Sequence, residues 1–231
     1  MLKFLFMVLV GALFVIFICC LFGINLKLFN NDFRFDTFFK KGTPRIDDKF
    51  GCWYITGKQG SNKSYYACYL ISRISPIAVN KIYTNVHSLK VKGFDIVYFD
   101  KITELYENID EHCIFLIDEL SRKYDKNSRT DTQFYAWLNQ SRKRKRIVIM
   151  ITQEWRELPM WLRRPAKYMF SSVPTILRFF NIYKCVVGDA ENLVFNKDEG
   201  EYECPTIKKV YYKRIKKVAN LYDTFEPINF L

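Results

Sequence analysis

The chain is short of the residues that build disordered, collagenous or metal-rich proteins. It has nine glycines and seven prolines in 231 residues, and neither a low-complexity segment nor an internal repeat is visible. This composition argues against disordered and collagen-like chains. Only His87 and His112 supply imidazoles, and no two of the seven cysteines have CxxC spacing, so a zinc site is not expected. We read the cysteines as reduced thiols in the cytosol.

Acidic residues are also in deficit. The chain has 24 Asp and Glu against 36 Lys and Arg, a formal net charge of +12. A positive bias of this size suggests an acidic partner, either nucleic acid or anionic lipid headgroups. The hydrophobic content of 49% is enough for a real core, and the length fits one ordinary domain plus an appendage.

The appendage is a long apolar run at the N-terminus. Residues 4–24 contain no charged or strongly polar side chain, and at about 1.5 Å per residue they span the hydrocarbon core of a bilayer. The run lacks the small-residue cleavage site of a signal peptide, so it predicts a transmembrane helix. Lys3 alone precedes it, whereas five cations follow between residues 27 and 45. We therefore expect a single-pass protein of the host-cell inner membrane, with its N-terminus outside and the rest in the cytoplasm.

The next feature is a loop with the pattern of a phosphate-binding site. An apolar run over 52–56 precedes GKQGSNKS at 57–64, and a helix is predicted over 65–72. Backbone N–H groups in such a loop and at the helix N-terminus attract phosphate oxygens. Lys63 would reach the β- and γ-phosphates, and the Ser64 hydroxyl would ligate Mg²⁺. The alternative is a polar turn before a helix that merely contains a lysine.

One position of this loop departs from the usual pattern. Asn62 stands where a second glycine is expected. Asparagine enters left-handed backbone geometry more readily than most residues, so the loop can still close.

A second chemical signal follows a buried strand. Residues 113–119 (CIFLIDE) are a continuous apolar run that ends in two carboxylates, which is typical of a central parallel strand. Beside the loop at 57–64, Asp118 could hold Mg²⁺ and Glu119 could deprotonate the attacking water. The alternative is an exposed acidic turn. Shorter strands are predicted over 82–86 and 94–99, and a polar helix over about 101–109.

The segment after the acidic pair ends in another buried strand. A helix over 132–142, capped by Asp131, is predicted to lead into five consecutive cations at 142–146 and an apolar strand that ends at Gln153. At that position Gln153 could hydrogen-bond the γ-phosphate or the water, unless it belongs to an ordinary turn. Further on, Arg163 and Arg164 are candidate arginine fingers for a neighbouring subunit, although structural ion pairs are the commoner role.

From residue 182 onward the chain is predicted to form short antiparallel strands, over 183–187, 193–195 and 209–212, at one edge of the sheet. Cations and tyrosines alternate at its end: Lys208, Lys209, Tyr211, Tyr212, Lys213, Arg214, Lys216 and Lys217. Together with the cations at 142–146, this cluster could follow a nucleic-acid backbone. A solvated surface or a membrane surface are the alternatives. The organisation expected is thus an anchor at 1–25, a juxtamembrane linker at 26–49, a core at 50–181 and a C-terminal extension at 182–231.

Taken together, these segments resemble a known family. The loop at 57–64, the strands at 82–86 and 114–119, the arginine-rich turn into 149–153 and the tail at 221–225 are similar to those of zonular occludens toxin-like (Zot) ATPases. These are assembly and export proteins of filamentous bacteriophages, within the FtsK–HerA group of P-loop ATPases. The resemblance covers about residues 50–225.

The resemblance implies an α/β fold, an additional-strand, RecA-like P-loop NTPase sheet flanked by helices. The N-terminal membrane helix and the small antiparallel C-terminal extension predicted above would be attached to it. The resemblance also implies an oligomeric ring at the inner membrane that couples ATP hydrolysis to extrusion of single-stranded phage DNA, alongside other assembly or coat proteins. The implied site residues fall into three groups. ATP would be bound by Gly57, Lys58, Gln59, Gly60, Ser61, Asn62, Lys63, Ser64 and Tyr65; Mg²⁺ by Ser64 and Asp118; and Lys63, Glu119, Gln153, Arg163 and Arg164 would act in catalysis.

The position of the apolar run keeps two other functions open. The best-known filamentous-phage proteins carry their membrane helix after the ATPase domain, whereas here it comes first. An N-terminal anchor with a cytoplasmic motor also suits a DNA translocase or a genome-packaging ATPase. A nucleotide-binding membrane scaffold without turnover is the third possibility.

Overall fold

The computed structural model describes residues 6–7, 9–11, 13–14, 49–74, 76, 79–173, 175, 178–179, 181–198 and 200–223. Most of the predicted anchor over 4–24, and the linker up to residue 48, lie outside these residues. Helical backbone is present at 6–7, 9–11 and 13–14. Within the described part of the chain, no helix combines the length and the apolar character needed to cross a membrane.

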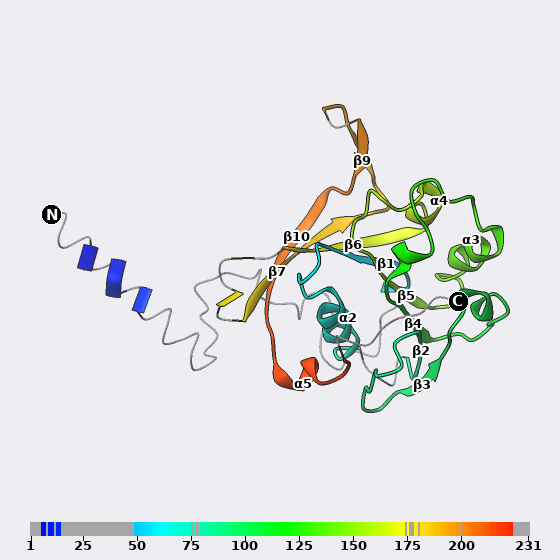
Figure 1. Cartoon of the computed structure of the whole chain (residues 1–231), viewed down its shortest axis with the longest axis horizontal. Coiled ribbons are helices and arrows are strands. Elements are labelled where there is room, and N and C mark those ends of the chain that lie inside the picture. The colour runs from blue at the N-terminus through cyan, green and yellow to red at the C-terminus, as the bar shows by residue number, and fades with distance from the viewer. Residues whose placement is uncertain are drawn as a thin grey trace.

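The elements follow one another in an α/β pattern (Figure 1). In chain order they are β1 Gly51–Thr56, α2 Lys63–Ile71, β2 Lys81–Thr84, β3 Asp95–Tyr98, the 3-10 helix η4 Ile102–Leu105, β4 Cys113–Ile117, the 3-10 helix η5 Leu120–Arg122, α3 Thr132–Asn139, β5 Ile147–Ile151, α4 Met160–Arg163, β6 Ala166–Val173, β7 Ile182–Asp189, β8 Val194–Asn196, β9 Glu201–Glu203, β10 Thr206–Lys213 and α5 Lys216–Ala219.

Eight of these strands form one sheet in the order β10-β7-β6-β1-β5-β4-β2-β3. The six strands from β6 to β3 pair in parallel. Strands β7 and β10 continue the sheet in antiparallel pairing, as expected for the C-terminal extension. Strand β5 lies between β1 and β4, which is the additional-strand arrangement implied by the sequence. The fold prediction is therefore confirmed for the sheet.

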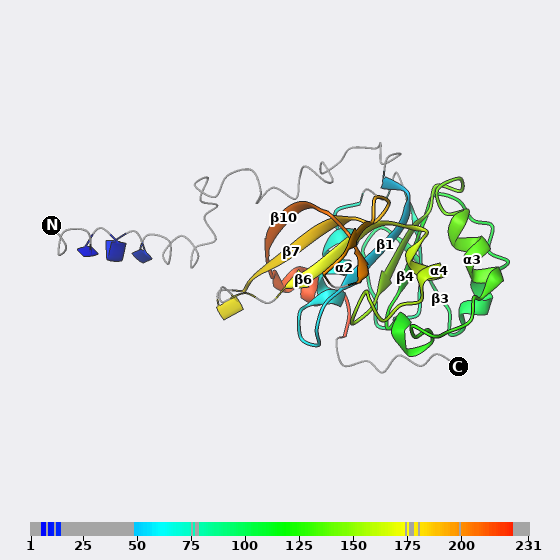
Figure 2. The ribbon, with the colours of Figure 1, turned by 90° about the horizontal axis from the view of Figure 1, so that it is seen from above.

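The two faces of the sheet bury separate cores because successive side chains of a strand point to opposite faces. In β1, Trp53 and Ile55 belong to the core that includes α2, whereas Cys52 and Tyr54 belong to the core that includes α3. Figures 1 and 2 show α2 and α3 on opposite sides of the central strands. Every residue of β1, β4 and β5 is buried, which explains their unbroken apolar sequences.

Two predicted helices are shorter than expected. In place of a helix over 101–109, the chain makes the single 3-10 turn η4. Its buried residues Ile102 and Leu105 are three apart, and that spacing lies on one side of a 3-10 helix. Helix α3 begins as predicted with Asp131, whose side chain accepts the Phe134 N–H. It ends at Asn139 because the chain then turns back towards β5.

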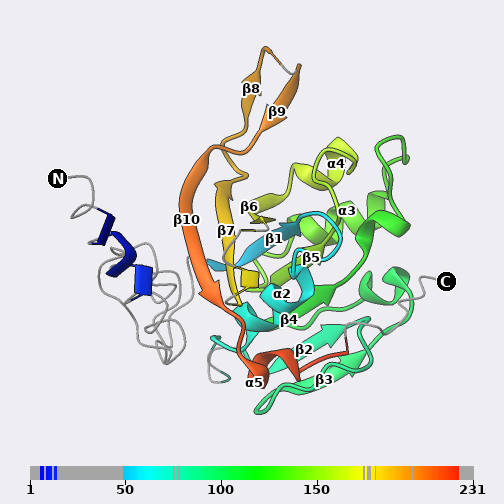
Figure 3. The ribbon, with the colours of Figure 1, turned by 60° about the vertical axis from the view of Figure 1, so that its left-hand side comes forward.

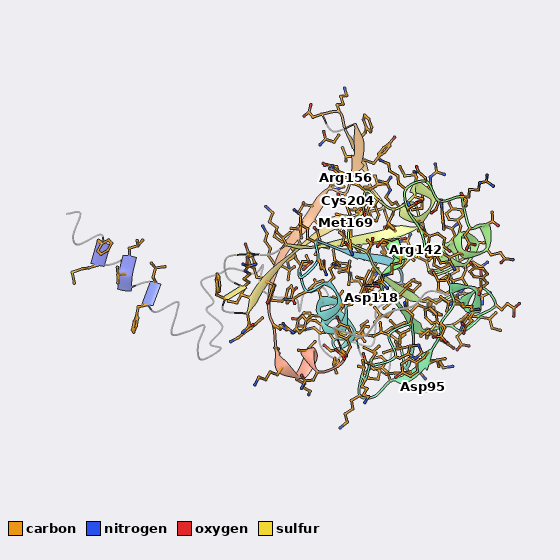
Figure 4. The ribbon with its side chains drawn as sticks, viewed as in Figure 1. Asp95, Asp118, Arg142, Arg156, Met169 and Cys204 are labelled. Carbon is orange, nitrogen blue, oxygen red and sulfur yellow. The ribbon has the colours of Figure 1, made fainter. Side chains whose placement is uncertain are left out.

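The chain between β7 and β10 forms a separate hairpin. Strands β8 and β9 pair antiparallel as a two-stranded sheet, and the hairpin projects beyond the main sheet (Figure 3). An ion pair between Arg156 and Glu203, 2.7 Å apart, connects it to the body of the molecule. Figure 4 shows Arg156 and Cys204 close together at the base of this hairpin. Strand β9 was not predicted, and its three residues contain two charges.

Arg146, the last cation of the run at 142–146, is a core residue. Its side chain is 0% exposed. It donates to the carbonyl oxygens of Asn108 and Asp110, both at 2.6 Å, and its guanidinium lies 5.4 and 5.3 Å from the ring centroids of Phe115 and Trp137. A run of cations predicts a surface, so assigning Arg146 to a nucleic-acid surface was wrong.

We expect Arg146→Ala to lower the free energy of unfolding by about 3–5 kcal/mol, because it leaves a cavity in the core and removes the donor from the Asn108 and Asp110 carbonyl oxygens. Urea unfolding monitored by tryptophan fluorescence measures this. The matched control is Lys143→Ala in the same run, where the side chain is exposed and the change should stay within about 0.5 kcal/mol. Equal stabilities for the two variants would contradict the structural role of Arg146.

Candidate nucleotide-binding site

The loop between β1 and α2 is shaped by three residues with unusual backbone geometry. Gly57 has φ +150°, and a Cβ there would come within 2.6 Å of the Ser172 carbonyl oxygen and the Ser61 hydroxyl, so only glycine fits. Gly60 has φ +76°. Asn62 has φ 64° and ψ 33°, the left-handed geometry expected from the sequence. That expectation is confirmed, and the loop closes without a second glycine at this position.

The loop is fastened to the neighbouring strands. The Gly57 N–H and the Thr56 hydroxyl both donate to the Gln153 carbonyl oxygen at 3.1 Å. From β6, the Ser172 hydroxyl donates to the Ser61 carbonyl oxygen. These contacts fix the loop before any ligand arrives, which is the preorganisation that a phosphate site needs.

Two residues predicted to bind Mg²⁺ lie side by side. The Ser64 hydroxyl, in the first turn of α2, donates to Asp118 Oδ2 at 2.9 Å. The two residues are 54 positions apart in the sequence. They meet because β1 and β4 are parallel strands separated only by β5, and the segments after parallel strands gather at one edge of the sheet. Figure 4 shows Asp118 close to α2.

Asp118 is 5% exposed. Burial raises the pKa of its carboxyl to about 6, while hydrogen bonds from the Ser64 hydroxyl and the Glu119 N–H act in the opposite direction. The carboxyl and hydroxyl oxygens of this pair are the kind of ligand that Mg²⁺ prefers. A bound cation would also favour the ionised form of Asp118. The residues therefore fit a magnesium site.

Lys63 is the first residue of α2 and directly precedes Ser64. Its ammonium donates to the Lys58 carbonyl oxygen at 3.2 Å and folds back over the loop. Burial lowers the pKa of Lys63, and the nearby carboxylates of Asp118 and Glu119 raise it. A cation partly removed from water, next to a nest of backbone N–H groups, is suited to phosphate oxygens.

Glu119 turns sharply away from β4. Its backbone is left-handed, with φ 56°, so its side chain departs from the direction of the strand. The carboxylate forms an ion pair with Arg122, with 2.6 Å between Oε2 and Nε. Arg122 was not predicted as a site residue. Its pairing with Glu119 is a contact three residues apart that a helical turn at this point would have indicated.

These residues line one cleft with a volume of about 420 Å³, which is within the usual range for small-molecule sites. Its lining comprises Gln59, Gly60, Asn62, Lys63, Ser64, Tyr65, Asp118, Glu119, Ser121, Arg122, Ile151, Thr152, Gln153 and Tyr222. Most of the predicted nucleotide-binding residues are therefore brought together. Gly57, Lys58 and Ser61 belong to the same loop but do not line the cleft.

Asn85 was not predicted as a site residue, and it positions Asp118. Its buried side-chain amide donates to the Asp118 carbonyl oxygen at 3.1 Å and accepts the Asp118 N–H at 2.9 Å. The available signal was its place directly after β2, the strand that pairs with β4. Polar residues that follow adjacent parallel strands meet at one edge of the sheet.

The two arginines predicted as fingers have different environments. Arg163 is 6% exposed, and a side chain buried in its own subunit does not extend into a neighbour, so Arg163 is withdrawn as a finger. Arg164 is exposed, and its role stays a prediction. Neither residue lines the cleft.

The C-terminal basic cluster also needs a correction. Tyr212 is 3% exposed and packs against Tyr65, Tyr66 and Tyr69, so it is not available to stack on a nucleic-acid base. The end of the cluster borders the cleft: the Ile215 N–H donates to the Tyr65 hydroxyl at 2.9 Å. The other group of cations, at residues 142–146, precedes β5 and therefore lies at the opposite end of the sheet from the cleft.

Comparison with known proteins gives the following matches. A family model described as "ATPase family associated with various cellular activities (AAA)" matches residues 53–172. No curated protein sequence matches the chain. Among solved structures, the N-terminal domain of zonular occludens toxin from Neisseria meningitidis is 17% identical with a TM-score of 0.54, covering 75% of this chain and 98% of that one. The expected similarity to zonular occludens toxin domains is thus confirmed for the fold.

Two more distant structures also match. The genome packaging NTPase B204 from Sulfolobus turreted icosahedral virus 2 is 13% identical with a TM-score of 0.48, over 75% of this chain and 100% of that one. The flagellar accessory protein FlaH from Methanocaldococcus jannaschii is 11% identical with a TM-score of 0.42, over 71% and 84%.

Proposed function

Since the chain belongs to the ATPase family associated with various cellular activities (AAA), we propose that it binds Mg²⁺–ATP in the cleft between residues 57–65 and Asp118 and hydrolyses it. The observation that carries this proposal is the hydrogen bond of 2.9 Å between the Ser64 hydroxyl and the Asp118 carboxylate. It places a pair of metal-ligand oxygens beside a lysine and a loop built for phosphate.

The residues of the cleft that the sequence predicted then have distinct roles. Lys63 and the backbone N–H groups of the loop hold the phosphates, and Ser64 and Asp118 hold the metal. Glu119 accepts a proton from the attacking water, and Gln153 hydrogen-bonds the γ-phosphate or that water. When bound, Mg²⁺ neutralises negative charge on the phosphates.

We further propose that hydrolysis drives assembly and extrusion of a filamentous phage, with export of single-stranded DNA through the inner membrane. The apolar run at 4–24 would anchor the chain, with the ATPase domain in the cytoplasm and other assembly or coat proteins as partners. The net charge of +12 supports an anionic partner. The fold shared with the zonular occludens toxin domain agrees with this proposal.

The β8–β9 hairpin supports the proposal of a homo-oligomer. Residues 189–203 contain six acidic residues and one lysine in a chain that is otherwise strongly basic. Val194, Phe195 and Tyr202 on this hairpin are exposed. An acidic hairpin with apolar side chains is complementary to the basic surface of a second copy, and repeated contacts of this head-to-tail kind can close a ring.

The test is ATP hydrolysis by the full-length chain with circular single-stranded DNA, with linear duplex DNA and without DNA. If the protein contacts about four phosphates of a single strand, its affinity for single-stranded DNA should fall about fiftyfold between about 50 and 200 mM salt. Preference for circular single strands supports extrusion. Stimulation by duplex alone would favour the DNA translocase or genome-packaging ATPase, which the N-terminal position of the apolar run also suits. ATP binding without hydrolysis under any condition would favour the membrane scaffold.

A further inference from the structure

The C-terminal end of the described chain returns to the nucleotide cleft. After β10 the chain enters α5, which contacts α2. The Lys90 N–H then donates to the Leu221 carbonyl oxygen at 2.7 Å, and the Asp223 N–H donates to the Ser88 hydroxyl at 2.9 Å. Figure 3 shows this path from β10 through α5 towards the side of the sheet that contains β2. Residue 222 is therefore held from both sides.

The residue between these two attachments, Tyr222, places its side chain in the cleft with Ser64 and Asp118. The side chain is half-buried there, and among the described residues that line the cleft it alone comes from the C-terminal end of the chain.

One loop, residues 85–90, organises this side of the cleft. Asn85 holds the backbone of Asp118, and Ser88 and Lys90 hold the backbone on either side of Tyr222. Asp118 and Tyr222, which line the same cleft, thus depend on the same six-residue connection after β2. A tail that merely rested on the surface would not share its support with the metal ligand.

We propose that Tyr222 is a positioning residue of the nucleotide site, whose hydroxyl holds the hydrated metal–triphosphate beside Ser64 and Asp118. The inference rests on the proposed function. Mg²⁺ releases its water ligands reluctantly and keeps several of them when bound to a protein. A phenol hydroxyl beside Ser64 and Asp118 is well placed to hydrogen-bond such waters, because it can both donate and accept.

The experiment measures binding of a fluorescent ATP analogue to the full-length chain, with Mg²⁺ and with EDTA. Tyr222→Phe removes only the hydroxyl, and we expect it to weaken binding about fivefold with Mg²⁺, the effect of one hydrogen bond, and to leave binding in EDTA unchanged. Ser88→Ala, which removes one attachment of the tail, should act in the same direction with a smaller effect. Tyr135→Phe on α3, a half-buried tyrosine that does not line the cleft, is the matched control and should bind like the wild type.

Three results would overturn the inference while leaving the proposed function intact. They are unchanged binding by Tyr222→Phe, an equal loss with Mg²⁺ and with EDTA, which indicates a general structural role, and tighter binding with Mg²⁺, which indicates that the tail obstructs the cleft. Circular dichroism of each variant establishes that it is folded. If the wild type itself does not bind the analogue, the proposed function is overturned and the inference falls with it.

Discussion

Lys63→Ala is expected to lower ATP turnover by about 10²–10³-fold and to weaken nucleotide binding. The lysine ammonium is half-buried, donates to the Lys58 carbonyl oxygen and is attracted by the carboxylates of Asp118 and Glu119. In the variant, both carboxylates face the cleft without this positive charge, and the phosphates lose a donor and meet like charge. The loss therefore affects ground-state binding as well as the transition state.

Phosphate release and binding of a fluorescent ATP analogue measure these two losses separately. Lys197→Ala is the matched control, because it removes one lysine from the exposed turn of the β8–β9 hairpin, remote from the cleft. It should retain the wild-type rate. If Lys63→Ala keeps more than about a tenth of the activity, the loop at 57–64 is not the phosphate site, since a donor to the transferring group contributes more than that.

The sequence predicted those parts of the site whose chemistry is local. Gly57, Asn62, Lys63 and Ser64 stand within eight residues of one another between a strand and a helix, so their relation follows from the chain itself. The position of Asp118 could be inferred from a buried strand ending in a carboxylate, because parallel strands present the segments that follow them at one edge of the sheet.

The parts of the structure that the sequence did not predict are contacts between distant segments. Asn85 is an ordinary polar residue directly after β2 and gains its role only because β2 pairs with β4. Tyr222 lies far along the chain from the loop it meets, and only the path through α5 shows the connection. Arg146 was misassigned for the same reason. Its carbonyl partners lie 36 and 38 residues earlier, so the sequence showed a cation beside other cations and concealed its burial.

The second large effect concerns Glu119, and the expected result separates binding from chemistry. Glu119→Gln keeps the size and shape of the side chain and leaves the hydrogen bond between Ser64 and Asp118 in place. Nucleotide binding should therefore stay within a few-fold of wild type. Turnover should fall by about 10²–10⁴-fold, because an amide cannot accept the proton of the attacking water.

The position of Glu119 explains why this substitution is informative. Its carboxylate forms an ion pair with Arg122, whereas the hydrogen-bonded pair proposed to hold the metal is Ser64 and Asp118, so a role as base is separable from metal binding. Glu154→Gln is the matched control, since Glu154 follows Gln153 directly, is exposed and does not line the cleft. Loss of binding together with turnover in Glu119→Gln would assign Glu119 to the metal instead. Turnover close to wild type would mean that another group in the cleft takes the proton.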